Sequence, residues 1–251
     1  MKLSLQGVKK RYGSVAVLDG VDLEVPSGGL QVVLGASGAG KSVLLRCFNG
    51  LERPDEGTVL VGDRAVETMS EAELVELRLD VGYVFQYSAL FDSLSVFENL
   101  AWAARAHRGL AGAELRAEAA RCLRQVGLDD LVESMEQVAP ATLSGGRRKR
   151  VAFARALAVA PVVLLHDEPT AGLDPASSRV IGRLIQELNS RAGITSVVVT
   201  HDVELALRLA HRIAILSGGR IVFQGTAGEL EAGRESGAIR HYLEGTPDSE
   251  P

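Results

Sequence analysis

The sequence predicts an α/β fold that carries an inserted helical segment. Short apolar runs typical of buried strands alternate with helical patterns along most of the chain, and a Gly-rich turn joins the run 30–34 to a helix from Val43 to Phe48. From Phe97 to Leu131, by contrast, Ala, Leu, Arg and Glu recur at helical spacing without any strand signal. An uninterrupted helical stretch inside alternating strands and helices indicates an insertion into an α/β core.

The Gly-rich turn is the strongest functional signal. Residues 35–42 fit the phosphate-loop pattern G-x-x-x-x-G-K-[ST] without a mismatch, in the strand, turn and helix order that the motif requires. Glycines let backbone amides approach phosphates, a lysine adds positive charge, and a serine hydroxyl can ligate Mg²⁺. The flanking strand and helix argue against a plain turn with a surface lysine. The predicted nucleotide-binding residues here are Gly35, Ala36, Ser37, Gly38, Ala39, Gly40, Lys41, Ser42 and Val43.

The first third of the chain predicts further short elements. We expect strands at 3–8, 21–25, 57–61 and 81–85, and a helix at 71–77, with a turn at Asp19-Gly20 between the first two strands. Tyr12 lies in a polar link and could either stack on a flat base or anchor a loop. Gln86 at a strand end is, by itself, an ordinary polar residue that ends a strand.

A second anion site and a pair of acids follow the helical insertion. Leu143-Ser144-Gly145-Gly146 leads directly into a helical run over 147–160, so a serine and two glycines precede a helix N-terminus. The apolar run 162–165 then ends in His166-Asp167-Glu168-Pro169. Acids at the end of a buried parallel strand face the crevice where α/β sheets bind ligands. One can hold Mg²⁺ while the other polarises a water molecule.

The last third continues the alternation. Asp174-Pro175 supplies an N-cap and a first-turn proline for a helix to about Arg191, and the strand 196–199 delivers Thr200-His201-Asp202 to the same sheet edge. A lone histidine after a strand is more often structural than functional. A hairpin over 212–216 and 220–224 is expected next, and the polar tail after Gly245 is expected to be loose.

Composition restricts the class of protein. The 251 residues are 46% hydrophobic and 24% charged, with a net charge of −5, which does not favour binding to a nucleic-acid backbone. The two cysteines, Cys47 and Cys122, lie in helical contexts and suggest buried thiols in a reducing compartment. The N-terminus lacks the apolar core of a secretion signal, and the run Val151–Leu165 is too short to span a bilayer. We therefore expect a soluble, cytoplasmic chain.

Together, these motifs and their order resemble the ATPase subunit of ABC transporters. The matching set is the phosphate loop, Phe85-Gln86, LSGG at 143–146, HDEP at 166–169, AGLD at 171–174 and THD at 200–202, and it covers about residues 3–230. The resemblance implies a P-loop NTPase core of mixed sheet and flanking helices with an N-terminal antiparallel β subdomain. It implies a single domain over 1–245, a helical subdomain at about 88–160 and a flexible tail at 246–251.

The resemblance also assigns roles. It implies that ATP and Mg²⁺ are the cofactors, that Ser42, Gln86 and Asp167 lie at the metal, and that Glu168, Gln86 and His201 serve catalysis, with Glu168 as general base. Tyr12 would stack on adenine, Ser144, Gly145 and Gly146 would close on the nucleotide of the opposite subunit, and Asp174 would lie between the two active sites. Arg147 and His166 depart from the usual family residues, and neither removes a catalytic group.

One chain carries one phosphate loop and one LSGG signature, so the resemblance implies a head-to-tail homodimer that ATP stabilises. The dimer would drive an integral-membrane permease contacted near Gln86 to Phe97, on the inner face of the cell membrane. Within the family, the segments 85–91, 96–99, 148–150 and 240–245 are similar to the Mla/Mce branch. This similarity predicts transport of phospholipid or other lipid and implies lipid-binding accessory subunits.

Three alternatives stay open from sequence. The first is the ATPase subunit of an importer of amino acids or another polar solute, since the substrate pocket lies in another chain. The second is an ABC-type ATPase acting on nucleic acid or ribosomes, against which the absence of paired ATPase domains and zinc-binding cysteines argues. The third is a non-hydrolysing nucleotide-binding regulator, against which Glu168 argues.

Overall fold

The computed structural model of the chain describes residues 1–233. Its strands are β1 (Leu3–Tyr12), β2 (Val15–Val25), β3 (Leu30–Leu34), β4 (Glu56–Val61), β5 (Arg64–Ala65), β6 (Val81–Val84), β7 (Val163–Asp167), β8 (Thr195–Thr200), β9 (Arg212–Ser217) and β10 (Arg220–Gly225). Its α-helices are α1 (Lys41–Phe48), α2 (Glu71–Asp80), α3 (Val96–Arg108), α4 (Gly112–Gln125), α5 (Gly145–Leu157), α6 (Pro175–Ala192), α7 (Val203–Leu209) and α8 (Ala227–Ala232). Short 3₁₀ turns occur at Val66–Thr68, Asp129–Leu131 and Pro140–Thr142.

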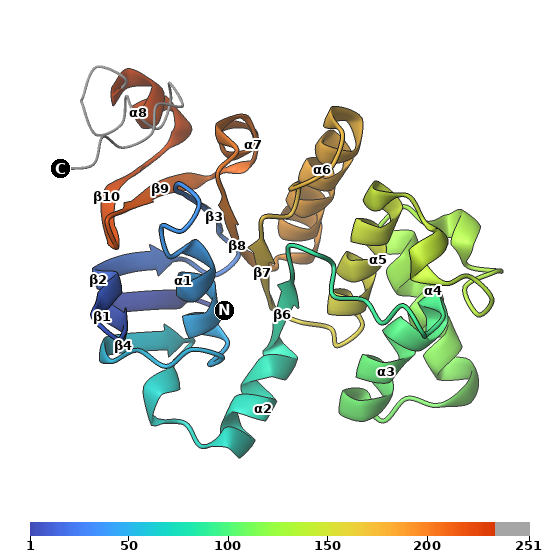
Figure 1. Ribbon diagram of the computed structural model, residues 1–251. Helices are drawn as coiled ribbons and strands as arrows, with labels where there is room; N and C mark the ends of the chain where they lie inside the picture. Colours follow the sequence, from blue (N-terminus) through green and yellow to red (C-terminus); the bar gives the residue numbers. More distant parts are fainter. Residues whose placement is uncertain (234–251) are drawn as a thin grey trace.

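The strands form two sheets (Figure 1). An antiparallel sheet has the order β2-β1-β4-β5, and a six-stranded sheet has the order β10-β9-β3-β8-β7-β6. In the larger sheet β3 pairs in parallel with β8 and β9, and β7 pairs in parallel with β6 and β8, whereas β10 returns antiparallel to β9. Every residue of β3, β7 and β8 is buried, as expected for parallel strands that are covered on both faces.

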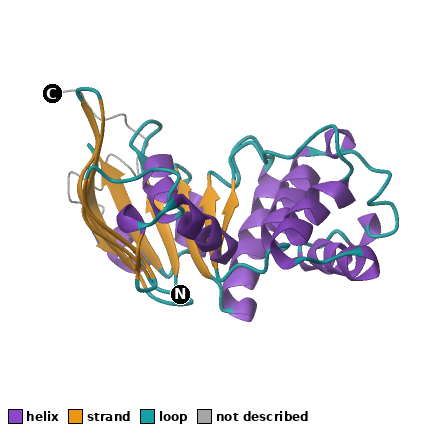
Figure 2. Ribbon diagram, turned by 90° about the horizontal axis from the view of Figure 1, so that it is seen from below, coloured by secondary structure: helices purple, strands orange, loops and turns teal. Residues whose placement is uncertain are grey.

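Two apolar cores lie on opposite faces of the six-stranded sheet, because side chains alternate along each strand. Val32 and Val198 belong to the core that includes residues of α3, α4, α5 and α6. Val33 and Val199 belong to the core formed with α1, α2 and the antiparallel sheet. The helices of the insertion therefore gather at one end of the molecule and the antiparallel sheet at the other (Figure 2).

The helical part begins at a capping box. Ser95 accepts a hydrogen bond from the Glu98 amide at 3.1 Å, and Glu98 accepts one from the Ser95 amide at 2.7 Å. One turn later the buried Asn99 side chain accepts from the Phe91 amide at 2.8 Å and donates to the Phe91 carbonyl at 3.0 Å. These bonds fasten the segment that follows β6 to the first turns of α3.

The predicted fold class is confirmed: an α/β core with an N-terminal antiparallel sheet and a helical portion between β6 and β7. The predicted turn at Asp19-Gly20 is wrong. The first strands are longer than expected, and the chain turns at Gly13, between β1 and β2. Gly20, with φ of 77°, instead lies at a shift of register inside β2, where the Asp19 amide donates to the Gly219 carbonyl at 2.8 Å.

Two short helices were not predicted, although both begin with recognisable caps. Asp202 accepts from the Leu205 amide at 2.9 Å at the start of α7, and Thr226 and Glu229 form a capping box at the start of α8. Cys47 and Cys122 are buried free thiols. Among the described residues, no helix combines the length and apolar composition needed to cross a bilayer. The predicted loose tail and the segment 240–245 lie outside the described residues.

His166 is a polar group inside the helical core. It is 0% exposed, it stacks on Phe153 of α5 with ring centroids 5.3 Å apart, and in the described structure neither ring nitrogen has a hydrogen-bond partner. Burial is the largest cause that lowers the pKa of His166 to about 3 from its ordinary 6.5. The imidazole is therefore neutral in the folded chain and acts as a packing group.

We expect His166→Leu to remove an acid sensitivity of the fold. As pH falls below 6.5, the unfolded chain binds a proton that folded His166 does not, and this lowers the free energy of unfolding by about 1 kcal/mol per pH unit until pH nears the folded pKa. In thermal unfolding without nucleotide, the variant should match or exceed the parent at pH 7.5 and decline less between pH 6.5 and 5.5, by a few degrees. The exposed His107→Gln should decline like the parent. Equal declines for His166→Leu and the parent would contradict this.

Candidate functional site

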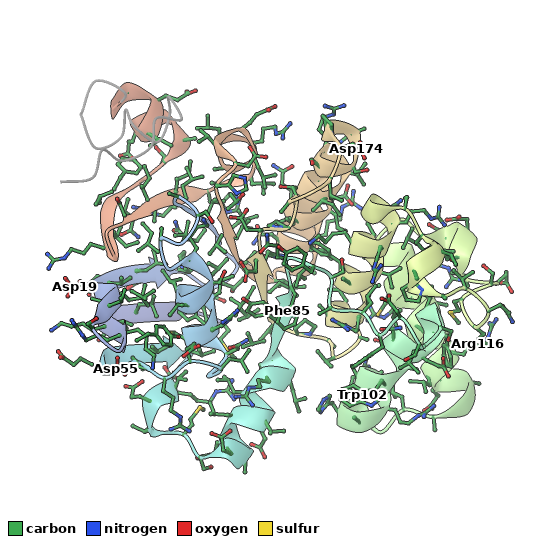
Figure 3. The ribbon with its side chains drawn as sticks, in the orientation of Figure 1. Asp19, Asp55, Phe85, Trp102, Arg116 and Asp174 are labelled. Atoms are coloured by element: carbon green, nitrogen blue, oxygen red, sulfur yellow. The ribbon has the colours of Figure 1, made fainter. Side chains whose placement is uncertain are left out.

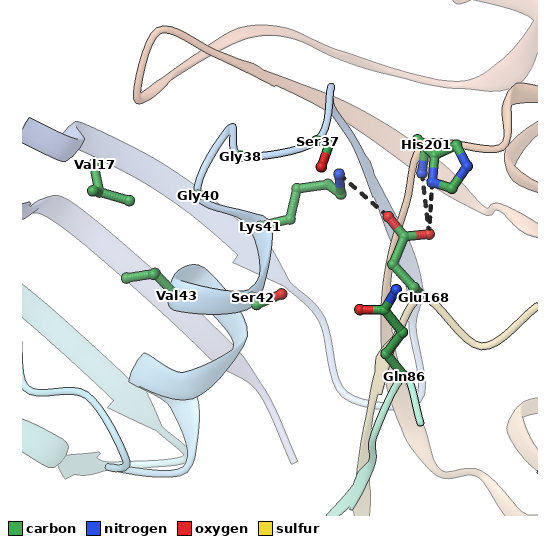
Figure 4. A pocket seen from close by; sticks show the side chains of 10 residues that line it. All are labelled: Val17, Ser37, Gly38, Gly40, Lys41, Ser42, Val43, Gln86, Glu168 and His201. Atoms are coloured by element: carbon green, nitrogen blue, oxygen red, sulfur yellow. Dashed lines mark hydrogen bonds and ion pairs between the residues drawn. The ribbon is translucent and has the colours of Figure 1, made fainter. Parts of the chain in front are cut away.

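A cavity of about 400 Å³ opens at the edge of the six-stranded sheet where β3, β7 and β8 end (Figure 4). The strand register brings these ends together, because Leu34 lies opposite Thr200 and Asp167 lies opposite Val199. The cavity combines the phosphate loop with Gln86, Glu168 and His201, three positions far apart in sequence. Its lining residues are Val17, Ser37, Gly38, Gly40, Lys41, Ser42, Val43, Gln86, Glu168 and His201.

The phosphate loop needs glycine at two tightly packed positions. Gly40 caps α1 with φ of 97°, and a Cβ there would lie 2.8 Å from the Val17 carbonyl. A Cβ at Gly35 would lie 2.8 Å from the Leu216 carbonyl. The loop therefore runs close to the backbone of β2 and β9, and its amides and the positive end of α1 are left to face the cavity. Ala36 and Ala39 line an adjoining hollow of about 300 Å³.

Lys41 is the cation of the cavity. Its side chain is nearly buried, and its ammonium donates to the Gly35 carbonyl at 2.7 Å and the Ala36 carbonyl at 2.9 Å. It also lies 3.3 Å from Oε1 of Glu168. A buried ammonium requires such partners. The same partners hold it where a bound anion could replace them.

Asp167 is fixed by two hydroxyls. Ser42 donates to Oδ1 at 2.9 Å, and Tyr83 of β6 donates to Oδ2 at 2.9 Å. Burial, followed by the charge of Asp167, raises the pKa of Tyr83, so the phenol stays protonated and keeps donating. A carboxylate beside a serine hydroxyl is a donor set that suits Mg²⁺, which takes one or two protein oxygens and fills its shell with phosphate oxygens and water.

Glu168 is held in one orientation by the end of β8. Its Oε2 accepts from the Thr200 hydroxyl at 3.1 Å and lies 3.0 Å from Nδ1 of His201. Glu168 is 8% exposed and has φ of 45°, an uncommon conformation for a residue with a side chain. Backbone strain of this kind costs about 1–3 kcal/mol and gathers at functional sites. His201, in contrast, keeps a side chain that is 65% exposed.

The predicted signature residues Ser144, Gly145 and Gly146 do not line the cavity. They begin α5, on the other side of β7 from α1 (Figure 1). A Cβ at Gly146 would lie 2.7 Å from the Ser177 hydroxyl, so the signature packs on the first turn of α6. Asp174 caps that turn, and the Ser177 hydroxyl and amide lower the pKa of Asp174 (Figure 3).

Tyr12 is also absent from the cavity lining. It ends β1, is 45% exposed, and lies under the Lys10 ammonium, which is 5.6 Å from its ring centroid. Burial, then Glu52, raises the pKa of Tyr12 to about 12. The exposed part of the ring leaves room for a stacking partner, and adenine stacking at Tyr12 stays a prediction.

Sequence reasoning missed two residues that the structure places at the site. Tyr83 is one, and its apolar strand context gave no sign that its hydroxyl reaches Asp167. Lys149 is the other. It lies in the basic run 147–150, a pattern typical of a solvated helix face, yet it is 2% exposed and donates to the Gln86 carbonyl at 2.6 Å.

Comparison with known proteins gives a consistent result. The sequence pattern of the family described as "ABC transporter" matches residues 18–171. The chain is 42% identical over 221 residues to the "Methionine import ATP-binding protein MetN" of Rhizobium johnstonii, covering 88% of this chain and 60% of that protein. It is 40% identical to the protein of that name from Clostridioides difficile, covering 91% and 70%. The chain thus spans about two thirds of the length of these relatives.

Solved structures show the same fold. The dimeric structure of MJ0796, described as a bacterial ABC transporter cassette, superposes with a TM-score of 0.82 at 34% identity, covering 90% of this chain and 98% of that chain. The cbiO1 protein of Clostridium perfringens, part of the ABC transporter complex cbiONQ, gives 0.81 at 29% identity, covering 96% and 98%. None of these relatives supports the Mla/Mce lipid branch, and the methionine importers favour its amino-acid alternative.

Two glycine variants separate steric contact from backbone strain in the phosphate loop. Gly38 and Gly40 both have positive φ, but a Cβ at Gly38 meets nothing within 4 Å. We expect Gly40→Ala to lower the free energy of unfolding by at least about 2 kcal/mol more than Gly38→Ala, because it adds a clash to the strain. Urea unfolding without nucleotide measures the difference, and equal losses would show that the close approach to Val17 does not constrain the loop.

Proposed function

The chain belongs to the ABC transporter family, and on that premise we propose that it is the ATP-binding and ATP-hydrolysing subunit of a membrane transporter. One observation carries the proposal: a buried lysine, a serine-aspartate pair and an oriented glutamate converge on one cavity at the start of a helix. That set supplies a phosphate cradle, a magnesium site and a base for water. It also argues against a nucleotide-binding regulator without hydrolysis.

ATP binding would draw on contacts that already exist. The triphosphate would take the loop amides and the Lys41 ammonium, replacing the carbonyl bonds from Lys41 to Gly35 and Ala36. Ser42, Asp167 and Gln86 would hold Mg²⁺, which would supply positive charge to the phosphates. Val17 and Val43 give the cavity an apolar side. The exposed Tyr12 would contribute adenine stacking.

Hydrolysis would depend on Glu168 as the general base. Thr200 and His201 hold its Oε2, and its Oε1 pairs with Lys41. Once Lys41 binds the phosphate instead, Oε1 would be free to accept a proton from water. General-base assistance contributes about 10²–10⁴-fold to a rate. His201 reaches the cavity from the next strand and would contact the γ-phosphate.

A second copy of the chain would complete each site. Ser144, Gly145 and Gly146 begin α5 across β7 from the cavity, so in one chain they lie outside the cavity lining. Asp174 adjoins them at the first turn of α6 and would lie between the two sites. A head-to-tail dimer would bring one signature to the other cavity, and the similar MJ0796 cassette is described as dimeric.

The permease would dock beside the segment Gln86 to Phe97. Tyr87 is 85% exposed. Phe91 and Trp102 meet edge to face with centroids 6.4 Å apart, and both stay at least half exposed. Trp102 lies on α3 in the helical part (Figure 3). Exposed aromatics clustered on a monomer mark an interaction surface. This contact would place the chain on the inner, cytoplasmic face of the cell membrane.

Import of methionine or a related amino acid is the substrate class that the comparisons favour. The support is the identity of 39–42% to methionine import proteins over 88% or more of the chain. The lipid-transport interpretation, with its accessory subunits, rests on short segments of sequence and is the second candidate. Action on nucleic acid is the least supported candidate, because a net charge of −5 disfavours binding to a phosphate backbone.

We expect Glu168→Gln to abolish turnover without abolishing binding. Loss of the base should lower kcat at least 100-fold. The ATP Kd should stay within a few-fold, and the ATP-bound dimer should accumulate in size-exclusion chromatography with Mg·ATP. Lys41→Ala should weaken ATP binding itself, and the exposed Glu204→Gln should behave as the parent. Normal hydrolysis by Glu168→Gln would remove Glu168 as the base.

Copurification from detergent-solubilised membranes tests the transporter proposal and its substrate class together. The tagged chain should retain an integral-membrane protein, and the isolated complex should bind methionine or a similar amino acid in equilibrium dialysis. Tyr87→Ser should lose the membrane protein but keep its basal ATPase rate. Bound lipid with no amino acid would favour the second candidate. Stimulation of hydrolysis by RNA or ribosomes, with no membrane partner, would overturn transport.

A further inference from the structure

The segment after β6 is held by two cations of α5. Lys149 donates to the carbonyls of Phe85 at 3.2 Å and Gln86 at 2.6 Å. Arg155 donates to the carbonyls of Ala89 at 2.5 Å and Ser88 at 3.2 Å. Four carbonyls within five residues therefore accept hydrogen bonds from one helix, and that helix begins at the signature residues.

Lys149 differs from an ordinary core residue because burying its ammonium costs desolvation free energy. It is 2% exposed, and Phe153, four residues later on the same face of α5, is fully buried. Burial lowers its pKa to about 8, against the charges of Asp167 and Glu168, which raise it. An apolar side chain would fill the same space without this cost. The Lys149 ammonium instead binds two backbone carbonyls, that of Phe85 before the Gln86 Cα and that of Gln86 after it.

The held segment has a shape that needs external support. Ser88 has φ of 63° and Ala89 has φ of 49°, and neither is glycine. Two consecutive residues with side chains in the left-handed region form a strained backbone that persists only where the surrounding structure imposes it. Arg155 bonds the carbonyls of these two residues, and Asn99 holds the far end of the segment at Phe91. The path of the chain from Gln86 to Phe91 is thus imposed by the helical part.

We propose that Lys149 is a positioning residue for the ATPase reaction. By holding the Phe85 and Gln86 carbonyls to α5, it fixes where the Gln86 side chain meets the metal and γ-phosphate. The inference rests on the proposed function, and in particular on the proposed role of Gln86. Lys149 does not line the cavity, and it acts through the Gln86 backbone. A displacement of α5 then moves Gln86 with it.

The test compares Lys149→Met, which keeps length and loses the charge, with Arg150→Met as a matched control. Arg150 is the next residue and also donates to carbonyls, those of Gly127 and Val126, but these lie in the helical part away from Gln86. We expect Lys149→Met to lower kcat at least tenfold and to raise the Mg²⁺ concentration for half-maximal rate several-fold. ATP Kd should stay within about twofold. Arg150→Met should keep kcat within about twofold.

Rescue and a spectroscopic readout distinguish positioning from stability. Lys149→Arg keeps the donors and should return kcat to within about threefold of the parent. Trp102 is the single tryptophan and contacts Phe91, so its fluorescence reports on the held segment without catalysis. Its emission should change in Lys149→Met and not in Arg150→Met. If Lys149→Met does not fold, Lys149→Leu, which also removes the donor, replaces it with the same expectations. Unchanged kcat and emission in the folded variant would overturn the proposal.

A double-mutant cycle with Gln86→Ala separates this inference from the function it rests on. If Lys149 acts through Gln86, the double variant should have the kcat of Gln86→Ala within about twofold. Full turnover by Gln86→Ala alone would show that the proposed role of Gln86 fails. Suppose instead that Gln86→Ala loses turnover, while Lys149→Met either has no effect or lowers kcat by the same factor with and without Gln86. That result would overturn the role of Lys149 and leave that of Gln86 intact.

Discussion

The register of three parallel strands is the constraint on which the site depends. Leu34 lies opposite Thr200, and Asp167 lies opposite Val199, so β3, β7 and β8 end at one level of the sheet. Residues from three distant parts of the sequence follow these ends. A slip of one residue would turn Asp167 to the other face of the sheet and separate it from Ser42. Because all three strands are buried on both faces, that register is strongly specified.

The charges of the cavity are arranged so that each has a partner before any ligand binds. Lys41 is shared between loop carbonyls and Glu168, Glu168 is shared between Lys41 and the end of β8, and Asp167 accepts from Ser42 and Tyr83. This arrangement limits the cost of burial. It also means that a bound triphosphate with Mg²⁺ would exchange one set of partners for another of matching charge. The strained φ of Glu168 is maintained by the strands around it.

Sequence predicted what depends on local patterns and failed where distant contacts decide. The phosphate loop, the Asp167-Glu168 pair and the Asp174 cap could be predicted because each is marked by residue types that serve a local purpose. Glycines permit the loop, acids end a strand, and a proline follows the cap. A glycine that permits positive φ serves a turn and a bulge equally, so the turn assigned to Asp19-Gly20 was wrong. Tyr83 and Lys149 have no local signature, since their partners come from other elements. The prediction of the lipid branch rested on short segments of sequence, and the identity of 42% to a methionine import protein over 88% of the chain outweighs them.

The two cores suggest how an event at the nucleotide could reach the helical part. Lys41 and Ser42 begin α1, which packs in the core on the antiparallel-sheet side. Gln86 follows β6, and its backbone is bonded to α5, which packs in the core on the other face. A ligand in the cavity therefore touches groups anchored in both cores. On the proposed function, loss of the γ-phosphate would remove contacts that both cores share. A displacement of Gln86 would then be passed through α5 and Asn99 to the exposed aromatics Phe91 and Trp102. The same segment thus borders the cavity at Gln86 and the exposed aromatics at Phe91.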